Sequence, residues 1–146
     1  MPGDDMNSKD MLTSVLHTVQ MGQAGIQCVQ DHAVRPGLKI ELQKQLEEYD
    51  AMETKAKQLA RDNKWILSDI PQSVVKMSSI MSRARLLGGE RDSKIAGMLI
   101  QGNTRGMILG MKNLRQGNKA DENVRALAQQ LIEQERTSIE NTEKFL

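Results

Sequence analysis

The side chains best suited to hold a soft metal or to act as a nucleophile lie near the N-terminal end of the chain: His17, Cys28 and His32. On a helix, Cys28 and His32 share one face because they are four residues apart, and His17 projects in roughly the same direction. His17 would nevertheless lie about 16 Å along the axis from Cys28. This face is also opposite the apolar stripe of the segment. We therefore expect neither a closed metal site nor nucleophilic catalysis here, but solvent-facing or interface roles.

A different kind of site is indicated by Glu135, a carboxylate in the centre of an otherwise apolar helical stripe. A buried carboxylate must be hydrogen-bonded or paired, because otherwise it destabilises the fold strongly. The expected polar cluster consists of Glu135, Tyr49 and Gln45, closed by Gln23 or Arg105. The cluster is either a network that fixes the register of the core or an altered ligand site. Glu135 is also the only, weak, candidate for a metal ligand.

Five helical segments have to position these side chains. The chain is rich in strong helix formers, and no segment alternates as a half-buried strand would. Proline and glycine mark the boundaries at Pro36, Pro71, Gly88 and Gly117. The expected helices span about residues 8–33, 36–63, 69–87, 92–116 and 120–146. We expect an all-α fold with a single domain over residues 1–146, in which residues 1–7 are flexible.

The fourth expected helix carries an unusual series of glycines: Gly97, Gly102, Gly106 and Gly110. Each glycine inside a helix costs up to about 1 kcal/mol relative to alanine, so the series needs a structural reason. We expect a close approach of another helix backbone, with Gly22 and Gly25 as counterparts. The alternative is that the glycines accommodate bulky Met or Tyr side chains.

The fourth helix also has a second apolar side. It is formed by Ile100, Met107, Met111 and Leu114. An all-round apolar helix is buried on two sides. We expect the second side to be covered by the short third helix, through Val74, Met77, Ile80 and Met81, or by another subunit.

Two long hairpins that flank a shorter helix predict a four-helix bundle with one long connection. The two hairpins are also weakly alike in register, so that Tyr49 corresponds to Glu135; an internal duplication and mere helical periodicity both explain this likeness. Residues 42–53 (LQKQLEEYDAME) and the DNKW ending at Trp65, before the segment led by Pro71, resemble the ferritin-like superfamily. In particular they are similar to the spore-coat type F branch and related uncharacterised bacterial families. The resemblance implies a ferritin-like bundle of bacterial origin.

A di-iron bundle of this kind needs Glu-x-x-His on two of its helices and a glutamate on each of the others. This chain contains no Glu-x-x-His; its nearest matches are Glu47-x-x-Asp50 and Glu135-x-x-Ser138. Amides stand where the first and fourth helices would supply ligands, at Gln20 and Gln101. We therefore expect a metal-free protein without a cofactor.

Composition narrows the function further. The 146 residues carry a net charge of +1, and only three are aromatic, so neither nucleic-acid binding nor an anionic membrane is indicated. No apolar stretch suits a membrane span or a signal peptide. We expect a cytoplasmic, or spore-associated, homo-oligomer with a structural or protein-interaction role and no enzymatic activity. The alternatives are a metal-binding or redox-linked protein with a non-standard site near Glu135, and a regulatory bundle that binds a partner helix.

Overall fold

The computed structural model describes residues 6–146, and every regular element in that part of the chain is helical. The long helices are α1 (Ser8–Val29), α2 (Pro36–Asp62), α4 (Arg91–Gln116) and α5 (Glu122–Thr142), with the shorter α3 (Gln72–Arg85) between α2 and α4. Short 3-10 turns follow α1 and α5, as η2 (Gln30–His32) and η3 (Glu143–Phe145). The predicted all-α class is confirmed, and no described helix has the length and apolarity needed to cross a membrane.

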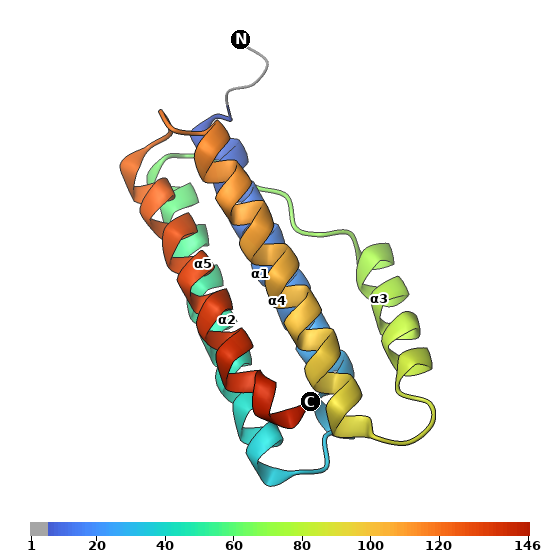
Figure 1. The fold of residues 1–146 in the computed structure, drawn as a ribbon. Helices are drawn as coiled ribbons and strands as arrows, with labels where there is room; N and C mark the ends of the chain where they lie inside the picture. The colour runs from blue at the N-terminus through green and yellow to red at the C-terminus, as the bar shows by residue number, and fades with distance from the viewer. Residues whose placement is uncertain (1–5) are drawn as a thin grey trace.

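The four long helices lie side by side as two antiparallel hairpins, α1 with α2 and α4 with α5 (Figure 1). The segment between α2 and α4 carries the chain back along the bundle, so these two helices run in the same direction (Figure 1). Each long helix buries one apolar stripe in the shared core. The largest fully buried side chains of this core include Leu12, Leu16 and Ile26 of α1, Leu38, Leu42 and Met52 of α2, and Ile95 of α4.

Local signals explain where the helices begin. The side chain of Asn7 accepts a hydrogen bond from the amide of Asp10 (2.8 Å) and caps α1. Pro36 occupies the first turn of α2, where its missing N–H costs nothing. The predicted start of the third helix at residue 69 is wrong, because Pro71 holds an extended conformation and α3 begins only at Gln72.

The N-terminal segment for which the sequence predicts flexibility is described only in part. Residues 1–5 lie outside the described residues. The amide of Met6 donates to the carbonyl of Gln116 (3.2 Å), and Asn7 caps α1. The chain at Met6 and Asn7 is therefore attached to the end of the bundle.

The position of α3 corrects the expectation that it covers α4. The helix stands beside the bundle and packs along α1 (Figure 1). Only Ser82 is buried, while Val74, Met77, Ile80 and Met81 are exposed. On α4, Met111 is exposed and Ile100, Met107 and Leu114 are half-buried. Sequence periodicity gives α3 its apolar face, but the extended chain before Gln72 places this helix on the outer side of α1.

Candidate functional site

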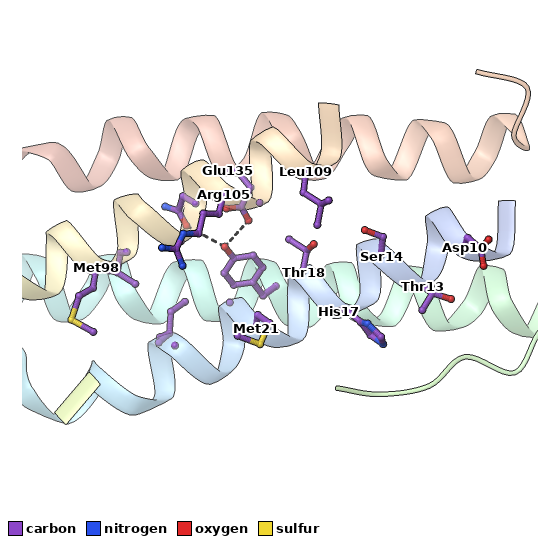
Figure 2. A pocket seen from close by; sticks show the side chains of 18 residues that line it. Asp10, Thr13, Ser14, His17, Thr18, Met21, Met98, Arg105, Leu109 and Glu135 are labelled. Atoms are coloured by element: carbon purple, nitrogen blue, oxygen red, sulfur yellow. Dashed lines mark hydrogen bonds between the residues drawn. The ribbon is translucent and has the colours of Figure 1, made fainter. Parts of the chain in front are cut away.

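A groove with a volume of about 570 Å³ lies between α1 and α4 (Figure 2). We call it the α1/α4 groove. Its apolar walls include Met21 and Ile26 of α1 and Met98, Leu99 and Leu109 of α4. Met98 lies near one end and Asp10 near the other (Figure 2). Pockets that bind small molecules commonly have volumes of about 300–1,000 Å³, mostly apolar walls and a few convergent polar groups.

Glycines open the middle of this groove. A Cβ atom at Gly25 or Gly102 would meet nothing within 4 Å, and both residues line the groove. Larger side chains at these positions would project into the space between α1 and α4. The groove is therefore a consequence of the same glycines for which the sequence predicts tight helix packing.

The predicted close approach of two helix backbones is wrong, because none of these glycines has the backbone of another helix among the atoms nearest to its Cβ position. Gly97 also has open space around its Cβ position. Where glycines are crowded, side chains crowd them: a Cβ at Gly22 would lie 2.5 Å from the ring of Tyr49, and one at Gly110 would lie 2.8 Å from Ile132. At Gly106 the nearest atoms belong to Thr18 (3.0 Å) and Glu135 (3.4 Å). The alternative interpretation, a bulky side chain against glycine, holds at Gly22.

The floor of the groove is polar and joins three helices. The hydroxyl of Tyr49 on α2 donates to Oε1 of Glu135 on α5 at 2.6 Å (Figure 2). The amide of Asn103 on α4 lies 3.2 Å from the same hydroxyl. Because the phenol has one proton, which goes to Glu135, Asn103 must present its NH₂ group. In that orientation its nitrogen also donates to Oε2 of Glu135 at 3.2 Å.

The environment of Glu135 disfavours its charge. The side chain is 1 % exposed, and burial raises its pKa from the ordinary 4.5 to about 7, against the opposing effect of the Tyr49 hydrogen bond. No Lys, Arg or His within residues 6–146 lies at ion-pair distance from this carboxylate. Burial and the neighbouring Glu135 also raise the pKa of Tyr49 well above 10. The floor therefore holds a carboxyl that loses its proton near neutral pH.

Two residues of the predicted cluster lie elsewhere. Gln45 is buried, but its amide donates to Glu41 (2.8 Å) and Thr142 (3.0 Å), so it forms a separate polar contact between α2 and α5. Gln23 points away from Glu135 and donates to Asp50 at 2.8 Å. Helical spacing gave both residues a roughly inward direction but did not fix how far along the neighbouring helix each would reach.

Arg105 lies beside the cluster around Glu135, whereas Asn103 belongs to it. Arg105 lines the groove beside Glu135 but is exposed and forms no ion pair with it (Figure 2). Asn103, which sequence reasoning missed, takes the expected place of the closing residue. A signal for it exists, since Asn103 follows Ile95 and Leu99 at four-residue intervals on the buried stripe of α4.

A second, polar hollow lies between α1, α2 and the chain before α3. Here the amide of Gln20 donates to Glu53 (3.2 Å) and Asp69 (2.7 Å) and accepts from the amide of Ile70 (3.0 Å). Lys57 lies 3.5 Å from Glu53. The hydrogen bonds of Gln20 to Asp69 and Ile70 fasten the segment after α2 to the bundle.

His17, Cys28 and His32, whose side chains could bind a metal, do not come together in one site. Nε2 of His17 donates to the carbonyl of Ser68 at 2.8 Å, while Cys28 and His32 are half-buried on the following turns. Within residues 6–146, no three side chains of His, Cys, Asp or Glu are grouped as metal ligands would be. His17 is nevertheless one of the residues that line the α1/α4 groove.

Comparisons with family models, with curated proteins and with solved structures find no match for this chain. The assignment of function therefore depends on the groove and its floor.

Proposed function

We propose that this protein is a non-catalytic binding module, a helical bundle of ferritin-like type that holds a ligand in the α1/α4 groove. The single observation that supports this most is the groove itself, whose walls are apolar and whose floor carries Glu135 and Tyr49. Its volume and lining suit a small molecule. The proposal narrows the structural or interaction role indicated by the sequence to one defined surface.

The groove supports a binding role better than a metal-linked one. The groups hydrogen-bonded to Glu135 are a phenol and an amide, and a di-iron bundle instead gathers several carboxylates and imidazoles. A nucleophile paired with a base is also missing from the described lining of the groove, where His17 is bonded to a main-chain carbonyl. The proposal includes a cytoplasmic location, with spore association as its alternative.

A neutral solvatochromic dye tests whether the groove binds ligands. We expect Nile red to bind the wild-type protein at one site with a fluorescence increase. Gly102→Leu places a side chain in open space inside the groove, so it should weaken dye binding at least about tenfold without unfolding the helix. Gly97→Leu is the matched control, because Gly97 is also uncrowded and lies on the same helix outside the groove.

The two leucine variants make the result decisive. Helicity and urea denaturation should show that both variants are as folded as the wild type. Absence of dye binding to the wild type would contradict the proposal. Equal dye affinity for the wild type and Gly102→Leu would contradict it as well, since the dye would then bind elsewhere.

A further inference from the structure

The floor of the α1/α4 groove holds a carboxylate that forms no ion pair with any residue from Met6 to Leu146. Glu135 is 1 % exposed, and its side chain lines the groove. Tyr49 donates to Oε1 and Asn103 to Oε2, and both donors are neutral groups. Each carboxylate oxygen accepts two hydrogen bonds, so capacity for a further donor remains on the carboxylate.

The charged groups around Glu135 leave it without compensation. From α2, Tyr49 is its direct neighbour, and Glu48 on the same helix adds further negative charge near the phenol. From α1, His17 and Asp10 line the groove but form no bond to Glu135. From α4, Arg105 lies at the exposed rim without forming an ion pair. A buried carboxylate gains most from a cation that also donates hydrogen bonds.

The walls of the groove indicate what kind of molecule could carry such a cation. Its walls at Met21, Met98 and Leu109 are apolar. The groove is open at Gly102, where α4 lacks a side chain and a Cβ atom would meet nothing within 4 Å. A slender aliphatic body suits a groove of this volume with apolar walls.

We propose that the α1/α4 groove binds a small primary amine in its protonated form, with the ammonium group hydrogen-bonded to Glu135 and the aliphatic body against Met21, Met98 and Leu109. This inference rests on the proposed function and specifies the chemical class of its ligand. The ammonium supplies three donors to a site whose built-in acceptor is a carboxylate. The apolar walls shield the resulting ion pair from water, which strengthens it.

Three probes of equal length test the charge preference. They are hexylammonium, 1-hexanol and hexanoate, measured by isothermal titration at pH 8, where Glu135 is ionised. We expect the amine to bind at least about tenfold more tightly than the alcohol, the difference that a charge-assisted hydrogen bond provides. Hexanoate should bind most weakly because its carboxylate would lie against Glu135.

Glu135→Gln is the informative variant, because glutamine keeps the shape and an acceptor oxygen for Tyr49. It should abolish the preference for hexylammonium over 1-hexanol and leave the affinity for the alcohol unchanged. Arg115→Gln is the matched control, because Arg115 is an exposed arginine of α4 outside the groove, and this variant should retain the preference. Should Glu135→Gln reduce the folded fraction, the comparison of the three probes on the wild-type protein still decides the matter.

The outcomes separate this inference from the function on which it rests. Equal affinity for amine and alcohol, or tightest binding of hexanoate, would overturn the amine proposal. If Nile red binding still depends on Gly102 in that case, the groove remains a binding site for another chemical class. If neither the dye nor any probe binds, both proposals fail together.

Discussion

The hydroxyl of Tyr49 donates to Oε1 of Glu135 at 2.6 Å and so joins the middle of α2 to the middle of α5 across the core. Both side chains are almost completely buried. The pair lies directly beneath the α1/α4 groove, so it belongs to the packing of the bundle and to its candidate binding surface at once. Changes to either residue are therefore expected to affect stability and ligand binding through one contact.

Glu135 should make the stability of the protein decrease as the pH rises. Its pKa is about 7 in the folded protein, against the ordinary 4.5, so the folded state binds this proton more tightly than the unfolded chain. The stabilisation is fully present below pH 4.5 and is lost as the pH rises through 7. Between pH 4.5 and 8, the free energy of unfolding of the wild type should fall by up to about 3 kcal/mol more than that of Glu135→Gln. Urea denaturation of both proteins across this range measures the difference, and parallel pH profiles would contradict a buried carboxyl.

Tyr49→Phe should destabilise the fold more at pH 8 than at pH 5. The variant removes the donor to Glu135 and leaves the carboxylate buried, which costs about 1–3 kcal/mol when the group is charged. Because the hydrogen bond from Tyr49 lowers the pKa of Glu135, its removal should raise that pKa further. Urea titrations at the two pH values provide the measurement, and Tyr49→Phe in a Glu135→Gln background is the control. A cost independent of pH would argue against an ionised partner.

Gly22 and Gly25 should respond in opposite ways to alanine. A Cβ at Gly22 would lie 2.5 Å from the Tyr49 ring, which its bond to Glu135 holds in place, so Gly22→Ala should destabilise the protein by about 1–3 kcal/mol. Nothing lies within 4 Å of a Cβ at Gly25, and Gly25→Ala should stabilise it by up to about 1 kcal/mol. Thermal and urea midpoints of the two variants check this prediction. A stabilised Gly22→Ala would mean that the ring moves freely.

Asp92 should be the strongest single link between the α1–α2 turn and α4. Its carboxylate is largely buried and accepts from the amides of Val34 (2.8 Å) and Arg35 (2.9 Å). Asp92→Ala would leave both amides without this acceptor and should cost about 2–3 kcal/mol. Arg35→Gln is the control and should cost well under about 1 kcal/mol, since the guanidinium is mostly exposed. Equal effects of the two variants in urea denaturation would refute the importance of the buried bonds.

Self-association stays a prediction, and α3 presents the surface on which to test it. Met77 and Ile80 are 59 % and 65 % exposed on this helix. If two copies pair through that face, light scattering should give twice the monomer mass, and Met77→Lys should restore the monomer. Met107→Lys is the comparison on α4, where the side chain is half-buried. A monomeric mass for the wild type at every concentration would exclude the homo-oligomer.

Sequence reasoning succeeded for features that are set within one helix. Pro36 and Gly117 act within a turn or two, so the start of α2 and the end of α4 follow from local proline and capping geometry. Helical periodicity likewise places Glu135 and Tyr49 on the inward stripes of their helices. These properties depend on neighbours along the chain, which the sequence displays directly.

Tertiary structure decided the relations between helices. Periodicity states which way a side chain points from its own axis, but not the axial offset or rotation of the neighbouring helix. For that reason Gln45 met Thr142 instead of Glu135, and Asn103 took the closing position. The sequence by itself determined an all-α chain with a carboxylate in its core. Only the packing of α1 against α4 decided that the glycines beside this carboxylate form a groove, because a gap depends on both of the helices that border it.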